Sequence, residues 1–230
     1  MKTTTVAIVP AAGIGRRFDG TVRKTFVALN GTPLLIHTLK RLQDNAAITE
    51  IIPVLKEEDI EKWSEVIDAH GLSKVKRIVP GGRERQDSVF NALKILNDES
   101  LILIHDGVRP LFSSRLVERL INEINGFDGI VPALPVKDTI KIIDADNIVV
   151  STEDRSKLQA VQTPQVFPLR VIKEAYNRAY ADGFYATDDA ALVERIGGKV
   201  KVIEGSPFNI KVTTQEDLEM VQFLIKEQNL

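Results

Sequence analysis

The stretch "TTVAIVPAAGIGRRF" (residues 4–18) decides the fold class, because an apolar run passes directly into a loop of small residues and then arginines. Two closely spaced glycines, Gly13 and Gly15, begin this loop, but a dinucleotide-binding turn would place a third glycine where Phe18 stands. A P-loop would also need a Gly-Lys-Ser or Gly-Lys-Thr sequence, which does not follow. The loop therefore argues against NAD binding.

The same loop is suited to a polyphosphate. Its small residues allow backbone N–H groups to approach a ligand closely. Cationic side chains then supply charges that pair with phosphate oxygens. Four of them lie within nine residues: Arg16, Arg17, Arg23 and Lys24. The alternative is a solvated basic loop between a strand and a helix.

The composition is that of an ordinary globular protein. The chain has 230 residues, of which 43% are hydrophobic and 27% charged, so we expect one α/β domain over residues 1–230. A formal net charge of −2 gives no basic excess for nucleic-acid binding. Because the sequence contains no cysteine, it excludes disulfides, thiolate catalysis and cysteine-ligated zinc. No apolar run is long enough to span a membrane, so we expect a cytoplasmic protein.

Apolar runs alternate with helical patterns along most of the chain, which predicts a mostly parallel sheet with helices on both faces. We expect Thr32 to cap the first helix with Pro33 at its first position, and Thr213 or Thr214 to cap the last. The expected strands are residues 4–9, 49–55, 75–80, 101–106, 129–134 and 199–204, and the expected helices begin near residues 32, 57, 85, 113, 168 and 215.

One segment, residues 136–165, departs from this alternation. Apolar and polar residues alternate on both sides of "DADN" (144–147), a pattern typical of a two-stranded hairpin. A lone hairpin is only marginally stable in water, so we expect it to pack against a second subunit. The alternative is a surface hairpin that folds onto its own domain.

Several motifs in a fixed order resemble one enzyme family. They are "PAAGIGRRF", "RKTF", "GGRERQDSV", "HDGVRP", "VKDTIK", "QTPQ", "TDDAALVE" and "NIKVTTQEDL", and they extend from residue 10 to residue 218. Together they are similar to the 2-C-methyl-D-erythritol 4-phosphate cytidylyltransferases of the non-mevalonate isoprenoid pathway. The resemblance implies a Rossmann-like nucleotidyltransferase fold in which a protruding β-arm, residues 136–160, joins two subunits into a homodimer.

The resemblance also implies the reaction and its residues. The phosphate of methylerythritol phosphate would attack the α-phosphorus of CTP, with a divalent cation, normally Mg²⁺, held by Asp106. A phosphate monoester is already ionised near neutral pH, so no general base is required. The implied nucleotide-binding residues are Ala11, Ala12, Gly13, Gly15, Arg16, Gly82, Arg83 and Ser88. The implied catalytic residues are Arg17, Lys24 and Lys211, and the implied substrate-binding residues are Asp106, Arg109, Thr139, Arg155, Thr163 and Thr187.

Some positions carry a second interpretation. Thr187 also has the character of a helix N-cap. His105 is expected to be a structural hydrogen-bonding residue rather than a base. Arg83 departs from the family pattern, in which many members have Asp, and Gly107 and Val108 are conservative departures.

Two other functions fit parts of the pattern. A cytidylyltransferase for another polyol phosphate, such as ribitol 5-phosphate, would share the fold and the cations, but "VPAAG" (9–13) favours methylerythritol phosphate. A non-catalytic nucleotide-sensing module would keep the fold without turnover. A loss of turnover is disfavoured because the cationic and acidic site residues are all present: Arg17, Lys24, Asp106 and Lys211.

Overall fold

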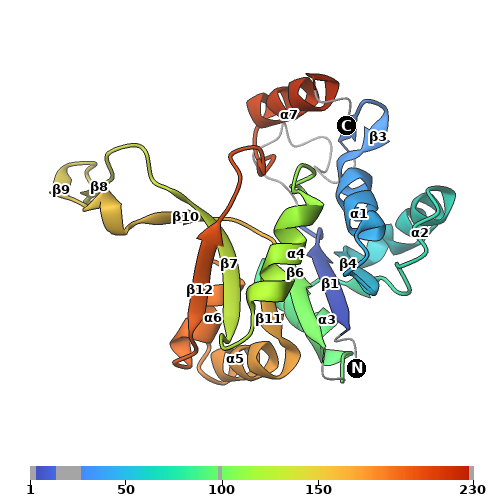
Figure 1. The fold of residues 1–230 in the computed structure, drawn as a ribbon, viewed down its shortest axis with the longest axis horizontal. Coiled ribbons are helices and arrows are strands. Elements are labelled where there is room, and N and C mark those ends of the chain that lie inside the picture. The colour runs from blue at the N-terminus through green and yellow to red at the C-terminus, as the bar shows by residue number, and fades with distance from the viewer. Residues whose placement is uncertain (1–3, 14–26, 98–99, 228–230) are drawn as a thin grey trace.

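The computed structural model describes residues 4–13, 27–97 and 100–227 of the chain (Figure 1). An eight-stranded sheet runs through it, in the order β10-β7-β11-β6-β1-β4-β5, and β12 pairs with β7. Its strands are β1 (Thr5–Pro10), β4 (Glu50–Leu55), β5 (Val79–Pro80), β6 (Leu101–Ile104), β7 (Gly129–Pro135), β10 (Gln159–Val161), β11 (Gln165–Pro168) and β12 (Val200–Glu204).

The predicted mostly parallel sheet is confirmed, with one addition. β1 pairs parallel with both β4 and β6, β4 with β5, and β7 with β12. The addition is a pair of strands that the sequence did not predict, β10 and β11, which are antiparallel to their neighbours. The strand expected over residues 75–80 is short, because only Val79–Pro80 pairs continuously and Val75 forms an isolated bridge to Ile51.

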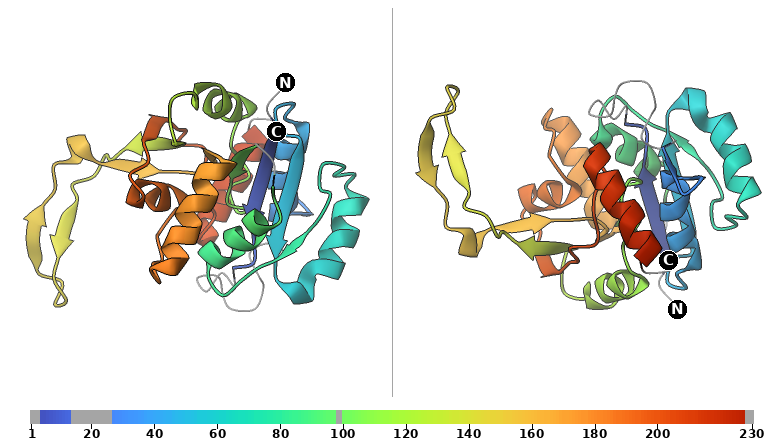
Figure 2. Two further views of the ribbon diagram at one scale, coloured as in Figure 1. Left: turned by 90° about the horizontal axis from the view of Figure 1, so that it is seen from below. Right: turned by 90° about the horizontal axis from the view of Figure 1, so that it is seen from above.

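Helices cover both faces of the sheet (Figure 2). Along β1, Val6 and Ile8 pack into a core with helices on one face, whereas Ala7 and Val9 pack into a second core on the other face. This alternation follows from the two-residue period of a strand. The first core includes α3 (Arg85–Lys94), α5 (Leu169–Ala181) and α6 (Asp189–Arg195), and the second includes α1 (Leu34–Asp44), α2 (Ile60–Ala69) and α4 (Ser114–Glu123).

The last helix, α7 (Gln215–Glu227), packs in a third apolar cluster with residues from α1 and from the hairpin of β2 (Ala28–Leu29) and β3 (Thr32–Pro33). No helix in the described part of the chain is long and apolar enough to cross a membrane.

Two of the three predicted helix caps are wrong. Thr32 and Pro33 form β3 (Thr32–Pro33), which pairs with β2 (Ala28–Leu29), so α1 begins only at Leu34. The turn between these strands is Asn30-Gly31, and both residues have positive φ, as a tight hairpin requires.

At α6 the N-cap is Asp188 rather than Thr187, because the Asp188 carboxylate accepts a hydrogen bond from the Ala191 backbone N–H. The prediction for α7 is confirmed, since Thr214 Oγ1 accepts from the Asp217 backbone N–H at 3.3 Å.

The hairpin predicted around "DADN" is confirmed. β8 (Lys141–Ile143) and β9 (Val149–Thr152) form a separate two-stranded sheet that extends away from the rest of the molecule (Figures 1 and 2). The Asp144 carboxylate closes the turn by accepting from the backbone N–H groups of Asp146 and Ile148. Five aliphatic side chains of this hairpin are 49–65% exposed: Ile142, Ile143, Ile148, Val149 and Val150.

Gly81 provides a test of how tightly the loops after β1 and β5 pack. Its N–H donates to the Leu55 carbonyl at 2.7 Å, and a Cβ added to it would lie 2.4 Å from the Ala12 Cβ. Gly81→Ala should therefore lower the free energy of unfolding by about 1–3 kcal/mol in urea titrations, as overpacking typically does. The double variant Gly81→Ala/Ala12→Gly removes the clashing atom and should recover most of this loss. A single variant as stable as the unsubstituted chain would contradict the packing.

Candidate functional site

The candidate site lies at the edge where the parallel strands end. β1, β4 and β6 run in the same direction, so the residues that follow them, including Ala11 and Asp106, meet at one edge of the sheet. Because β11 is antiparallel, its start reaches this same edge and brings Thr163 to it. Open α/β sheets bind their ligands in this position.

The described part of the first loop is held between two glycine-containing loops. The Ala11 N–H donates to the Val54 carbonyl at 2.8 Å. A Cβ added to Gly107 would lie 3.1 Å from the Ala11 Cβ, and Gly81 packs more closely still against Ala12. The backbone of the predicted nucleotide-binding cradle is thus fixed by the loops after β5 and β6. Four predicted residues of this loop, Gly15, Arg16, Arg17 and Lys24, lie outside the described residues.

Ser88 organises the turn that precedes α3. Its buried hydroxyl accepts from the Gly82 N–H at 3.1 Å and donates to the Glu84 carbonyl at 3.1 Å. A capping box between Glu84 and Asp87 fixes the start of the helix. Ser88 therefore shapes the turn that carries Gly82 and the exposed Arg83, and its hydroxyl hydrogen is already used within the protein.

Asp106 is the centre of the site, and three cations surround it. Arg85 Nε lies 3.2 Å from Oδ1, while Lys211 Nζ lies 2.8 Å and Arg109 Nε 3.6 Å from Oδ2. Burial alone would raise the pKa of Asp106, but Arg85, Lys211 and Arg109 hold it well below its usual range. The carboxylate is therefore ionised at every physiological pH.

Arg85 also contacts a second carboxylate. Its Nη2 lies 2.7 Å from Asp189 Oδ2, and Tyr176 donates its hydroxyl to Asp189 Oδ1 at 2.5 Å. Burial acts to lower the pKa of Arg85, but the carboxylates of Asp189 and Asp106 raise it well above its ordinary value. Neither Arg85 nor Asp189 was among the predicted site residues, although both lie within motifs that carry the family resemblance.

A chain of hydrogen bonds fixes His105 and the backbone of Asp106. His105 Nε2 lies 3.0 Å from the Arg109 carbonyl, which can only accept, so Nε2 carries the proton. Nδ1 then accepts from Thr163 Oγ1 at 3.0 Å, and Oγ1 accepts in turn from the Asp106 N–H at 3.1 Å. Burial lowers the pKa of His105 to about 4, so the ring is neutral at pH 7.

The loop before α7 brings Lys211 to the site. Arg109 Nη1 donates to the Asn209 carbonyl at 2.7 Å, and Asn209 Nδ2 donates to the Thr163 carbonyl at 2.7 Å. The buried Arg109 Nε makes no hydrogen bond within the described part of the chain. The structure thus brings together four predicted residues from three separate segments of the chain: Asp106, Arg109, Thr163 and Lys211.

Three predicted substrate-binding residues lie outside this cluster. Thr139 and Arg155 are exposed at the base of the hairpin, where Arg155 Nη1 donates to the Lys137 carbonyl at 2.6 Å. Thr187 is exposed in the loop before α6. Within one chain, the β8–β9 hairpin extends away from the ends of β1 and β6 (Figure 1).

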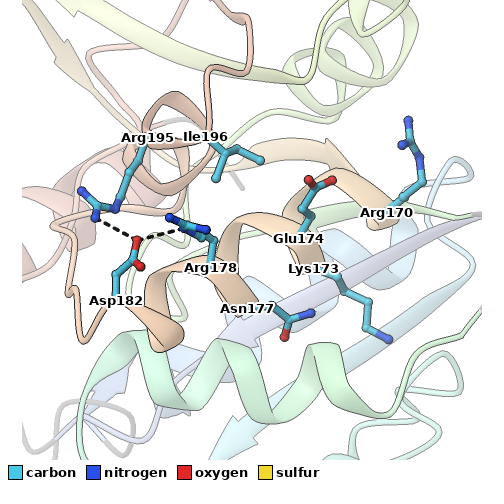
Figure 3. Close-up of a pocket in the computed structure, with 8 residues that line it drawn as sticks. All are labelled: Arg170, Lys173, Glu174, Asn177, Arg178, Asp182, Arg195 and Ile196. Atoms are coloured by element: carbon cyan, nitrogen blue, oxygen red, sulfur yellow. Dashed lines mark hydrogen bonds and ion pairs between the residues drawn. The ribbon is translucent and has the colours of Figure 1, made fainter.

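Two surface hollows lie elsewhere. One, of about 960 Å³, follows the outer side of α5 and the end of α6, where Arg178 and Arg195 both pair with Asp182 (Figure 3). The other, of about 1160 Å³, is lined by residues at the beginnings of β1 and β6, at the opposite edge of the sheet. No predicted site residue lines either hollow among the described residues, so neither is the candidate site.

Comparison with known proteins identifies the family. The family described as 2-C-methyl-D-erythritol 4-phosphate cytidylyltransferase matches residues 5–227. An enzyme of that name from Syntrophus aciditrophicus is 42% identical over 230 residues, covering 99% of this chain and 98% of the relative. Another, from Dictyoglomus thermophilum, is 43% identical over 232 residues, covering 98% of each.

A solved structure supports the same assignment. The 4-diphosphocytidyl-2C-methyl-D-erythritol synthase from Anaerococcus prevotii superimposes with a TM-score of 0.86 at 34% identity, covering 98% of this chain and 97% of that one. The match of fold and sequence over nearly the full length means that this chain belongs to the 2-C-methyl-D-erythritol 4-phosphate cytidylyltransferase family.

Proposed function

We propose that the chain transfers CMP from CTP to 2-C-methyl-D-erythritol 4-phosphate, giving 4-diphosphocytidyl-2-C-methyl-D-erythritol and pyrophosphate. The observation that carries this proposal is the Asp106 cluster, which places one ionised carboxylate and three cations beside the cradle formed by Ala11 and Ala12. Family membership supports the choice of both substrates. We place the reaction in the cytoplasm, where CTP is available.

The nucleotide is assigned to the loops after β1 and β5. Ala12 packs against Gly81 and Ala11 against Gly107, while a Cβ added to Gly13 would meet nothing within 4 Å. Such small residues let backbone N–H groups approach the base and the phosphates closely. Ser88 would act by holding Gly82 and Arg83 in place. The triphosphate would be bound by Gly15, Arg16, Arg17 and Lys24, which carry over from the family pattern, together with Lys211.

The sugar phosphate is assigned to the Asp106 cluster and to a second subunit. The buried Arg109 Nε–H lies 3.6 Å from Asp106 Oδ2 and makes no hydrogen bond to a described residue, so a phosphate bound here would take it as a donor. Thr163 would position Asp106 through its backbone, and Thr187 lies in the adjoining loop. Because Thr139 and Arg155 lie on the exposed hairpin, we assign them to the site of a partner chain in a homodimer.

A divalent cation, normally Mg²⁺, fits the site under one condition. The described residues contain no group of three side chains that would hold a metal by themselves, and both oxygens of Asp106 face cations. Lys211, whose side chain is 43% exposed, would have to leave Oδ2 for the metal to take its place. Asp106 would then be the one protein ligand, completed by phosphate oxygens as is typical of Mg²⁺. The bound ion would neutralise charge on the triphosphate.

The reaction needs positioning and charge neutralisation more than proton transfer. An oxygen of the sugar phosphate attacks the α-phosphorus of CTP, the bond to the β-phosphate oxygen breaks, and pyrophosphate leaves with the electron pair. The attacking phosphate is already ionised at neutral pH. His105 has both ring nitrogens engaged, which supports a structural role. Arg17, Lys24 and Lys211 would stabilise the charge that develops on the phosphates.

The substrate is tested by pyrophosphate release. Purified protein with CTP and Mg²⁺ should release pyrophosphate rapidly with 2-C-methyl-D-erythritol 4-phosphate and at most slowly with ribitol 5-phosphate. A preference for ribitol 5-phosphate would keep the chemistry and change the substrate. Release with neither compound would refute the proposed function.

Lys24→Ala tests the assignment of the triphosphate-binding loop. Loss of one charge-stabilising donor typically reduces turnover by about 100-fold, and we expect at least that loss in kcat with an unchanged circular dichroism spectrum. Lys199→Ala is the control, because its ammonium lies over the Phe127 ring, 5.0 Å from the ring centre, away from the site. A kcat for Lys24→Ala within a few-fold of the unsubstituted chain would remove Lys24 from the mechanism.

The homodimer is tested by a charge on the exposed hairpin. Val150, 65% exposed, should be covered in the dimer, so Val150→Asp should shift the mass in analytical ultracentrifugation from twice 25.6 kDa to 25.6 kDa and abolish most of the activity. Met220→Asp, at a position of similar exposure on α7, should leave the mass unchanged. An unsubstituted chain that sediments as a monomer at all concentrations would contradict the assignment of Thr139 and Arg155.

A further inference from the structure

Arg85 joins two carboxylates that belong to different parts of the fold. It is the first residue of α3, and it contacts Asp106 after β6 through Nε and Asp189 at the start of α6 through Nη2. Asp106 and Asp189 therefore share one guanidinium group. A planar, forked guanidinium can make both contacts at once, whereas an ammonium group has no such geometry.

Asp189 has no access to substrate. The residue is fully buried, and its two oxygens are occupied by Arg85 and by the Tyr176 hydroxyl. Tyr176 is itself only 1% exposed. A buried carboxylate costs free energy to desolvate and its ion pair contributes little net stability, so stability alone does not account for Asp189 at this position.

The two oxygens of Asp106 are held differently. Oδ1 faces Arg85, and the ion pair between Arg85 and the buried Asp189 fixes the position of the guanidinium. Oδ2 faces Lys211, which is 43% exposed, and Arg109 at the longer distance of 3.6 Å. Oδ1 is thus tied to the protein interior, and Oδ2 is the oxygen whose partner can exchange.

We propose that Asp189 and Arg85 are positioning residues for the transfer reaction, with Asp189 orienting Arg85 and Arg85 orienting Asp106 so that Oδ2 is presented to the ligand. Neither Asp189 nor Tyr176 touches the substrate. This inference rests on the proposed function, because the orientation of Asp106 is tested by its effect on the turnover of CTP and the sugar phosphate.

The neighbouring residue, Gln86, extends the same connection. Its Nε2 donates to the Phe184 carbonyl at 3.0 Å, and its Oε1 accepts from the Ala186 N–H at 2.9 Å. These bonds attach the loop that carries Thr187 to the start of α3. Arg85 therefore fixes the Asp106 carboxylate, and Gln86 fixes the loop that carries Thr187. Both parts of the proposed sugar-phosphate site are thus held in place relative to the turn before α3, which we assign to the nucleotide.

The first experiment is a double-mutant cycle on kcat/KM for the sugar phosphate. Arg85→Gln and Asp189→Asn should each lower kcat/KM by about 10-fold or more, the loss typical when a residue that orients a ligand-binding group is replaced. The double variant should lose no more than Arg85→Gln alone, because Asp189 acts through Arg85. Losses that multiply, or an Asp189→Asn variant within twofold of the unsubstituted chain, would overturn the proposal.

A matched pair of tyrosines separates positioning from stability, and it decides the question if Asp189→Asn does not fold. Tyr176 and Tyr180 lie one turn apart on α5, both stack on Phe90, and each donates its hydroxyl to a buried or half-buried carboxylate. Only the carboxylate at Tyr176 contacts Arg85, since Tyr180 donates to Asp87. With CTP saturating, Tyr176→Phe should lower kcat/KM for the sugar phosphate several-fold. Tyr180→Phe, whose partner Asp87 belongs to the nucleotide-side capping box, should lower the melting temperature and leave that kcat/KM unchanged.

Equal kcat/KM values for the two tyrosine variants would refute the positioning role. The unsubstituted chain separates this inference from the function on which it rests. If that chain is inert with CTP and both polyol phosphates, the proposed function fails and the inference falls with it. If it turns over and the variants match it, only the inference fails.

Discussion

The constraint on which the site depends is the charge of Asp106. A carboxylate that is 6% exposed is stable in ionised form only when cations lie close to it, and here they arrive from three directions. Arg85 comes from α3, Arg109 from the turn after β6, and Lys211 from the segment before α7. Arg85 and Lys211 lie on segments that are distant in sequence from Asp106, so their ion pairs fix the relative positions of loops that would otherwise be independent. Arg109 belongs to the same turn as Asp106.

The sheet makes this convergence possible. The parallel strands bring the ends of β1, β4 and β6 to one edge, and the antiparallel β11 returns the chain to that edge at Thr163. The Thr163 hydroxyl then connects the backbone of Asp106 to His105. Backbone geometry and charge thus act on the same residue, which limits the conformations that the site can adopt.

The sequence predicted the strands that have long Val and Ile runs and missed those that do not. β10 and β11 have only three and four residues, and β11 contains a glutamine and a proline, so no period-2 pattern marks them. The cap at Thr32 was wrong because the Asn30-Gly31 turn diverts Thr32 into a strand. At α6 a better capping residue, Asp188, stands directly after Thr187.

The candidate site was predictable only as a set of motifs. Asp106, Arg109 and Lys211 could be named from the resemblance, and the structure brings them together. The pairing of Arg85 with Asp189 joins residues 104 positions apart, and no spacing rule reveals a contact of that separation. Four residues of the basic loop were named from sequence and lie outside the described residues.

The exposed hairpin has a consequence for the life of the newly made chain. β8 and β9 form a two-stranded sheet that bears five exposed aliphatic side chains and unpaired strand edges. Such edges are templates for pairing with any other exposed strand. An uncovered hairpin of this kind makes the single chain prone to aggregation, so the homodimer proposed above would also protect the newly made chain's solubility by covering these edges.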